Sequence, residues 1–139
     1  MRPSVSGLNH ITLAVADVER SLAFYHDVLG CVVRASWADG AYLEAGAVWL
    51  CLSRDDNARS SPDPDYSHIA FSVAEEQFDA LSERLAVECI IWKNNSSEGK
   101  STYFVDPDGH KLEIHLGSLE QRLSHYRLNE FEGLKIFDR

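Results

Sequence analysis

Two histidines and one glutamate stand where their side chains could bind a metal ion. His10 and His68 each open an alternating run that ends in a small residue and then an acid, and Glu113 lies in a third alternating run over 111–116. Two neutral imidazoles and one carboxylate form a mixed nitrogen and oxygen shell that suits Mn²⁺, Fe²⁺, Zn²⁺ or Ni²⁺. Three protein ligands also leave coordination positions open for water or substrate, so the set predicts a catalytic metal site.

The elements that must position these residues form two copies of one unit, with a period of about 58 residues. Alternation predicts a first strand in each copy, and the small residue and acid after it predict the start of a helix. Three short strand-like runs follow each helix. The expected helices cover 18–29 and 75–86, and the later runs cover 31–36, 40–44 and 47–53 in the first copy and 89–93, 101–105 and 111–116 in the second.

Helix ends and apolar faces support this assignment. Asp17 is a candidate N-cap, and Gly30 suits the left-handed position after the helix. The apolar faces comprise Val18, Leu22, Tyr25 and Leu29 in the first helix and Phe78, Leu81 and Leu85 in the second. The stretch 106–109, Asp-Pro-Asp-Gly, predicts a hairpin turn between the last two strands.

The predicted fold is therefore α+β, with paired βαβββ modules in one domain. Module 1 covers about 7–59, module 2 about 66–117, and a C-terminal helix and tail cover 118–139, with a linker-like stretch at 60–65. Ser118 and Gln121 predict a capping box for the third helix, whose apolar face is Leu119, Leu123 and Tyr126.

Each twisted sheet can curl into half a barrel, and two such modules then enclose a cavity. His10 and His68 would occupy equivalent positions on the first strands, with Glu113 on the last strand of module 2. The first-module position that matches Glu113 falls near Leu50 or Cys51. His115 shares a strand face with Glu113 and is a rival ligand. His26, His110 and His125 are interpreted as surface residues.

Composition excludes several classes of function. The net charge of −9 argues against nucleic acid as a partner, although a local basic cluster could still bind a small anion. No run of about 20 apolar residues could span a membrane, and no apolar segment near the N-terminus predicts a signal peptide, so a cytoplasmic protein is expected. Cys31, Cys51 and Cys89 are odd in number and form no CxxC pair, which argues against a structural zinc site or a redox motif and predicts buried or free thiols in a reducing compartment.

The βαβββ repeat with paired histidines resembles the vicinal oxygen chelate superfamily of glyoxalase and extradiol dioxygenase relatives. Almost the whole chain is similar, more closely, to the FosA-type fosfomycin-resistance glutathione transferases. The motifs that carry this resemblance are Gly-Leu-Asn-His-Ile-Thr-Leu-Ala-Val at 7–15, Gly-Ala-Tyr-Leu-Glu at 40–44, Trp-Leu-Cys-Leu-Ser-Arg at 49–54, Tyr-Ser-His at 66–68, the loop at 92–99 and the segment 103–113.

The resemblance implies an activity and its cofactors. Members add glutathione to the epoxide of fosfomycin, which opens the ring, and they use Mn²⁺ assisted by K⁺. His10, His68 and Glu113 would be the metal ligands. Members are homodimers with modules exchanged between chains, so the resemblance also implies a domain-swapped homodimer in which His10 can come from the partner subunit.

Further roles follow from the resemblance and suit the chemistry of each side chain. The phosphonate would be bound by Lys93, Ser97, Ser101, Tyr103 and Arg122. Thr12 would hydrogen-bond the epoxide oxygen, Tyr42 would activate the incoming thiol, and Trp49 and Tyr66 would wall the apolar side. A potassium loop would comprise Asn95, Ser97, Gly99 and Ser101. Trp37, Asp39 and Ser53 are suggested for glutathione.

Alternative functions remain open from the sequence. A sister enzyme could open the epoxide with water or with another thiol, and a water-adding enzyme needs a carboxylate near the epoxide, for which Glu44 is a candidate. A non-catalytic antibiotic-binding protein is a further alternative, which the filled ligand positions disfavour. Glyoxalase or dioxygenase chemistry does not call for the loop from Lys93 to Ser101 or for Arg122.

Overall fold

The computed structural model describes residues 2–95 and 98–138, which contain two four-stranded sheets with their helices. Module 1 comprises β1 (His10–Val15), α1 (Val18–Ala23), the π-helix η1 (Phe24–Val28), β2 (Val32–Trp37), β3 (Gly40–Ala45) and β4 (Val48–Arg54). Module 2 comprises β5 (Ile69–Ser72), α2 (Glu75–Glu88), β6 (Ile91–Lys93), β7 (Lys100–Val105) and β8 (Lys111–Leu116). The helix α3 (Leu119–Leu128) follows.

The two sheets have the same topology. Their strand orders are β1-β4-β3-β2 and β5-β8-β7-β6, and in each sheet the first strand is parallel to the last while the other pairs are antiparallel. The predicted α+β fold with two βαβββ modules is therefore confirmed.

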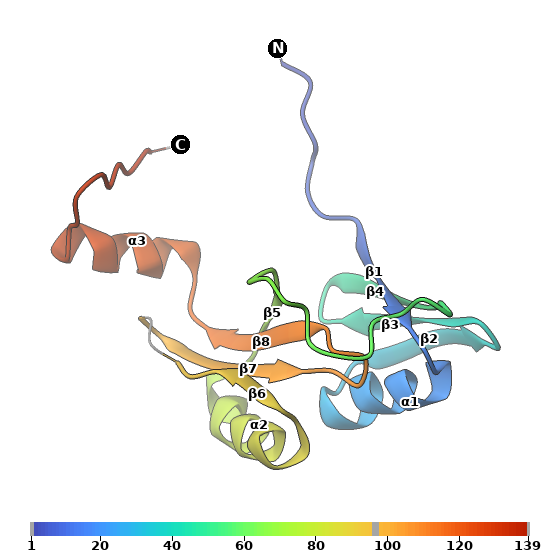
Figure 1. The fold of residues 1–139 in the computed structure, drawn as a ribbon. Helices are drawn as coiled ribbons and strands as arrows, with labels where there is room; N and C mark the ends of the chain where they lie inside the picture. The colour runs from blue at the N-terminus through green and yellow to red at the C-terminus, as the bar shows by residue number, and fades with distance from the viewer. Residues whose placement is uncertain (1, 96–97, 139) are drawn as a thin grey trace.

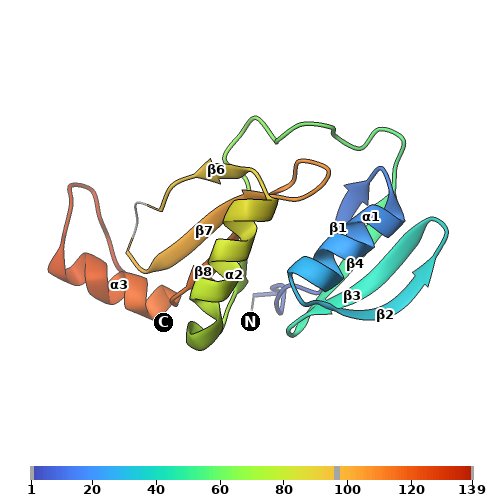
Figure 2. The same ribbon diagram turned by 90° about the horizontal axis from the view of Figure 1, so that it is seen from below.

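Helices α1 and α2 lie on the same side of the two sheets (Figures 1 and 2). Alternation directs one set of side chains from each strand toward these helices. The buried cluster that results includes Leu13, Val15, Leu43, Leu50, Leu52, Phe78, Leu85, Phe104, Leu112 and Ile114. The other face of each sheet carries the candidate site residues, so the position of the core decides which face remains available for chemistry.

The first predicted helix, over 18–29, is divided in the structure. Asp17 caps α1 by accepting a hydrogen bond from the backbone of Arg20, as predicted, but the α-helix ends at Ala23 and a π-helix continues to Val28. The backbone amide of Leu29 donates to the carbonyl of Phe24, five residues earlier, which gives the wider turn. Sequence periodicity does not distinguish these two helical turns over so short a segment.

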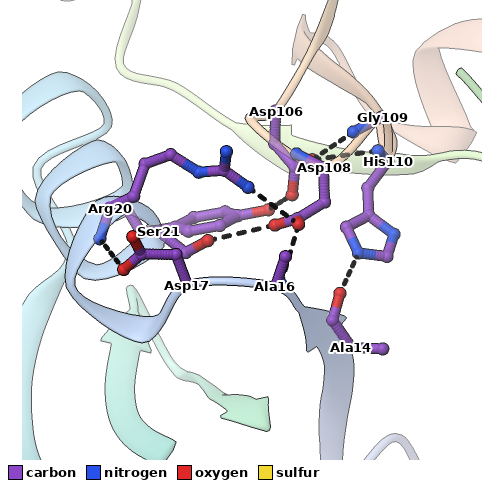
Figure 3. Close-up of polar contacts among 10 residues, drawn as sticks. Ala14, Ala16, Asp17, Arg20, Ser21, Asp106, Asp108, Gly109 and His110 are labelled. Carbon is purple, nitrogen blue, oxygen red and sulfur yellow. Dashed lines mark hydrogen bonds and ion pairs between the residues drawn. The ribbon is translucent and has the colours of Figure 1, made fainter. Parts of the chain in front are cut away.

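Residues from both modules form a polar junction (Figure 3). The carboxylate of Asp108, whose side chain is fully buried, accepts hydrogen bonds from the backbone amide of Ala16 at 2.9 Å, from Arg20 at 3.0 Å and from the Ser21 hydroxyl at 3.1 Å. These three donors belong to the end of β1 and to α1. The hairpin turn of module 2 is thereby attached to module 1.

Asp106 fixes the same turn from within. One carboxylate oxygen accepts hydrogen bonds from three backbone amides, those of residues 108, 109 and 110. The other accepts the hydroxyl of Tyr25, which is fully buried in η1, at 2.6 Å. Burial, together with the nearby Asp106 charge, raises the pKa of Tyr25 well above its usual value, so its hydroxyl remains a donor.

His110 is buried in this junction, so its interpretation as a surface residue is wrong. Its ring contacts the carbonyl of Ala14 through Nε2 at 2.8 Å and the guanidinium of Arg59 through Nδ1. A carbonyl requires a donor, so Nε2 carries the proton and Nδ1 accepts from Arg59. His26 and His125 are exposed, as predicted.

The C-terminal helix makes few contacts with the two modules. Ser118 caps α3 by accepting a hydrogen bond from the backbone of Gln121, as predicted. No residue of α3 is fully buried, and Leu119 of the predicted apolar face is 68% exposed. The helix and the tail project from the body of the chain on the side away from α1 and α2 (Figure 1).

Two further predictions concern the whole chain. Cys31, Cys51 and Cys89 are free thiols, as predicted, and burial raises the pKa of Cys31 to about 11. Among the helices that the structure describes, none has the length and apolar character needed to cross a bilayer.

Candidate metal centre and active site

His68 and Glu113 meet on the open face of module 2. His68 immediately precedes β5 rather than lying within it, and Glu113 lies in β8 opposite Ala70 of β5. The Nε2 atom of His68 is 3.0 Å from Oε1 of Glu113, and the glutamate is only 7% exposed. The parallel pairing of β5 with β8 thus brings together two residues that are 45 positions apart.

The tautomer of His68 suits metal ligation. Its Nδ1 lies 2.8 Å from the carbonyl oxygen of Tyr66, which can only accept a hydrogen bond, so Nδ1 carries the proton. In the neutral ring, Nε2 then presents a lone pair toward the carboxylate. The imidazole nitrogen and the carboxylate oxygen each present a lone pair at this distance, so both can act as ligands to one divalent cation.

Ser101 holds the second carboxylate oxygen. Its buried hydroxyl donates to Oε2 of Glu113 at 2.6 Å and lies 2.7 Å from Nδ1 of His115. Ser101 was predicted to bind substrate and potassium. In the structure its hydroxyl supports the glutamate, and this support is a contact that the sequence did not reveal.

Aromatic rings surround His68, and the ammonium group of Lys93 lies over two of them. The ring centroid of His68 lies 5.1–6.0 Å from those of Tyr66, Trp92 and Tyr103. The ammonium of Lys93 lies 4.8 Å from the centroids of Tyr66 and Tyr103, and it donates a hydrogen bond to the Tyr66 hydroxyl. This hydrogen bond raises the pKa of Lys93, so the site keeps a positive charge beside Glu113.

Module 1 presents its own group of predicted residues on its open face. The strand register aligns His10 with Trp49, and it places Thr12 and Tyr42 on either side of Cys51. The rings of His10 and Trp49 are 4.5 Å apart, and those of Tyr42 and Trp49 are 5.2 Å apart. His10 is exposed, and its Nδ1 lies 2.7 Å from the side-chain oxygen of Asn9.

His10 does not join His68 and Glu113 within one chain. Across residues 2–95 and 98–138, no three His, Cys, Asp or Glu side chains are grouped closely enough to hold a metal ion. Thr12 and His68 do line one open pocket of about 470 Å³ between the modules. The three-ligand site therefore remains a prediction.

The predicted potassium loop is partly described. The amide of Asn95 donates to the carbonyl of Gly99 at 3.1 Å, and Gly99 has φ +84°, a conformation that favours glycine. Ser101 follows at the start of β7. Ser97, predicted for both the phosphonate and potassium, lies outside the described residues.

Arg122 is engaged by a residue of the same loop. Its Nε donates to Oε2 of Glu98 at 2.8 Å, and this hydrogen bond raises the pKa of Arg122. The predicted phosphonate ligand is thus already paired with a carboxylate. The sequence placed Arg122 on the third helix but gave no indication of this pairing.

The candidate base for a water-adding reaction is also paired. Glu44 lies on the open face of module 1 with Tyr42, and its Oε1 accepts a hydrogen bond from Arg34 at 3.1 Å. Both side chains are largely exposed, so water screens the pair.

Comparison with known proteins places this site in context. Residues 7–114 match the Glyoxalase/Bleomycin resistance protein/Dioxygenase superfamily. The chain is 50% identical over 133 residues to a glutathione transferase FosA from Serratia marcescens, covering 94% of each chain. It is 38% identical over 136 residues to a metallothiol transferase FosB from Staphylococcus epidermidis, covering 88% of this chain and 92% of that protein.

A solved structure is similar over nearly its full length. A variant of the fosfomycin resistance protein FosX from Listeria monocytogenes, complexed with Mn(II) and 1S,2S-dihydroxypropylphosphonic acid, superposes with a TM-score of 0.77 at 33% identity. The match covers 88% of this chain and 99% of that chain.

Proposed function

Because the chain belongs to the glyoxalase, bleomycin resistance and dioxygenase superfamily, we propose that it is a metal-dependent glutathione transferase that opens the epoxide of fosfomycin. The observation that carries this proposal is the pair of His68 and Glu113, in which an imidazole lone pair and a carboxylate oxygen face one another beside the charged Lys93. The 50% identity to the Serratia enzyme supports glutathione as the thiol.

The proposed metal is Mn²⁺, held by His10, His68 and Glu113. The mixed nitrogen and oxygen donor set suits this ion, and the FosX complex contains Mn(II). When bound, the metal supplies Lewis acidity that favours negative charge on the epoxide oxygen as the ring opens. K⁺ is the proposed second ion, at the loop that contains Asn95, Gly99 and Ser101.

The phosphonate requires positive charge and hydroxyl donors. Lys93 is charged and lies over the ring of Tyr103, from which it can reach an anion on the open face. Arg122 is the second proposed cation, and binding would exchange its Glu98 partner for a phosphonate oxygen. The aromatic rings of Tyr66 and Trp49 would cover the apolar part of the substrate.

Module 1 supplies the groups proposed for the thiol and the epoxide oxygen. Thr12 offers a hydroxyl donor, and Tyr42 offers a phenol hydroxyl that can donate a hydrogen bond to the glutathione sulfur and so favour the thiolate, which is the nucleophile. Both lie on the face that carries His10. These residues act in one reaction only when this face meets the face that carries His68 and Glu113.

A second copy of the chain is the proposed means of bringing the two faces together. The open face of module 1 exposes 48% of Trp37, 39% of Tyr42 and 39% of Trp49, which are large apolar side chains. In a symmetric homodimer, module 1 of one chain can cover module 2 of the other, and both sites form at once. His10 then comes from the partner subunit.

Water is a second candidate nucleophile, favoured by one observation. The FosX complex contains a dihydroxypropyl phosphonate, the type of diol that water would form from this epoxide. In the present chain, Glu44 is the carboxylate that would have to activate water, and Arg34 holds it. The thiol and water reactions give products of different mass, so one assay separates them.

The test is a turnover assay followed by phosphorus NMR. Purified protein is incubated with fosfomycin, Mn²⁺ and K⁺, with and without glutathione. Mass spectrometry then measures the molecular mass of the product. We expect a new phosphonate signal that requires glutathione, has the mass of the adduct and disappears with a chelator. A diol formed without glutathione would establish the water reaction instead.

Two variants complete the design. His68→Ala should abolish turnover because it removes a proposed metal ligand, whereas His125→Ala, the same change at an exposed position on α3, should turn over normally. If the wild-type protein binds fosfomycin but forms no new product, the proposed enzymatic function is contradicted and an antibiotic-binding protein is favoured.

A further inference from the structure

His115 lies beside the proposed metal ligand and has no role in the reaction described above. It is in β8 two residues after Glu113, so both side chains lie on the same face of the sheet. Its Nδ1 is 2.7 Å from the hydroxyl oxygen of Ser101, and that hydroxyl is 2.6 Å from Oε2 of Glu113. The His115 side chain is 20% exposed.

The direction of these two hydrogen bonds follows from their chemistry. An ionised carboxylate only accepts, so the single hydroxyl proton of Ser101 is donated to Glu113. The serine oxygen must then accept from His115, and Nδ1 of the imidazole carries a proton. The result is a relay in which His115 donates to Ser101 and Ser101 donates to Glu113.

Two glycines leave room for the ring of His115 in this orientation. A Cβ atom at Gly99 would lie 3.2 Å from Cε1 of the ring, and one at Gly117 would lie 2.7 Å from Nε2. The backbone therefore lies close against the side of the ring that faces away from Ser101. With Nδ1 engaged by Ser101, the ring is placed to act as a hydrogen-bond donor to the serine.

We propose that His115 is a positioning residue, which orients the Ser101 hydroxyl so that Glu113 presents Oε1 toward the metal. The relay ties Oε2 to Ser101, and Oε1 is the oxygen that faces Nε2 of His68. Partners of this kind orient a ligand and raise its affinity for metal, and their loss commonly weakens binding 10- to 100-fold, roughly. The proposal rests on the metal site of the proposed function.

The experiment measures Mn²⁺ affinity directly, from the electron paramagnetic resonance signal of free Mn²⁺, with the full-length protein and without fosfomycin or glutathione. His115→Ala should weaken binding by about 10- to 100-fold. His115→Asn should bind within about threefold of wild type, because its amide can donate from the position of Nδ1. His115→Gln, whose amide occupies the position of Nε2, should not restore binding.

A double-mutant cycle tests the relay itself. If His115 acts through Ser101, the variant that combines His115→Ala with Ser101→Ala should bind Mn²⁺ no more weakly than the weaker single variant. Additive losses would indicate that His115 acts without Ser101, for example through its own 3.4 Å contact with Oε2 of Glu113, and would overturn the relay. His26→Ala, which changes an exposed histidine, is the matched control and should bind as wild type.

Other outcomes are equally decisive. A folded His115→Asn variant as weak as His115→Ala would show that only packing against the glycines matters, and so would contradict the relay. If His115→Ala does not fold, as judged by circular dichroism, the comparison of the Asn and Gln variants decides. Wild-type protein that binds no Mn²⁺ overturns the relay, whereas protein that binds Mn²⁺ but leaves fosfomycin unchanged overturns only the transferase.

Discussion

The carboxylate of Asp108 accepts a hydrogen bond from the backbone amide of Ala16 at 2.9 Å, and this bond joins the turn between β7 and β8 to the end of β1. Strand β1 carries His10 and Thr12, while β7 and β8 carry Ser101, Tyr103 and Glu113. The junction therefore sets how the two halves of the candidate site are oriented in each chain. In the proposed dimer, this orientation also determines how each half meets the partner.

Asp108→Ala is expected to lower the free energy of unfolding by about 3 kcal/mol. The change leaves the Ser21 hydroxyl buried without this acceptor and removes the partner of Arg20. Urea unfolding followed by circular dichroism measures the loss. Asp56→Ala removes a carboxylate that is 86% exposed and paired with Arg54, and it should change stability by less than about 0.5 kcal/mol. Equal losses in the free energy of unfolding for the two variants would show that the Asp108 junction does not stabilise the fold more than an exposed ion pair does.

Gly109→Ala should be more harmful than Gly46→Ala. Both glycines have positive φ, +101° and +59°, so alanine is strained at either position, by about 1–2 kcal/mol. A Cβ at Gly109 would also lie 2.2 Å from the carbonyl oxygen of Ser61, whereas nothing lies within 4 Å at Gly46. Thermal unfolding of the two variants isolates the clash with the linker, and equal melting temperatures would argue that the linker moves freely.

Stability should fall in alkaline solution partly because of Cys31. Burial raises the pKa of this thiol from 9.0 to about 11 in the folded protein. A raised pKa means that the neutral thiol stabilises the fold below pH 9, and that this contribution is lost as the pH rises from 9 to 11. At pH 10 the loss is about 1.4 kcal/mol.

Denaturant unfolding at pH 7 and pH 10, at one protein concentration, measures this loss. Cys31→Ala serves as the control, because it retains every other alkaline titration, including those of Cys89 and Tyr25. Wild type should lose about 1.4 kcal/mol more than the variant between the two pH values. The same loss in both proteins would show that the folded state does not perturb Cys31.

Mixing two inactive variants tests whether the site is shared between subunits. His10→Ala and His68→Ala homodimers should each be inactive, because every site lacks one proposed ligand. After co-refolding, half of the dimers contain one chain of each kind, and one of their two sites is intact if His10 acts across the interface. We expect about 25% of wild-type turnover. No recovery, with heterodimers demonstrated by mass spectrometry, would place His10 and His68 in one chain.

Several features of the fold could be predicted because they depend on local chemistry. The alternation after His10 and His68, the caps at Asp17 and Ser118 and the left-handed Gly30 each involve only residues that are neighbours in the chain. The internal repeat then indicated the same succession of elements, βαβββ, in both modules. Helix 18–29 was predicted less accurately, because a π-turn and an α-turn share nearly the same apolar spacing.

The junction could not be predicted, because its hydrogen bonds join distant residues. The Asp-Pro-Asp-Gly stretch indicated a turn, yet the partners of Asp108 lie about 90 residues earlier in the chain. His110 illustrates the same limit. A histidine after a turn is usually exposed, and only the contacts with Ala14 and Arg59 reveal that it is buried.

For the candidate site, the sequence by itself determined which residue types are available and which residues of one strand share a face, because side chains alternate along a regular strand. Only the tertiary structure decided that His68 and Glu113 meet at 3.0 Å, that the Ser101 hydroxyl lies between Glu113 and His115, and that His10 lies apart on the other module. The physical reason is that strand pairing within module 2 brings its residues together, whereas the core and the Asp108 junction orient the two modules of one chain side by side.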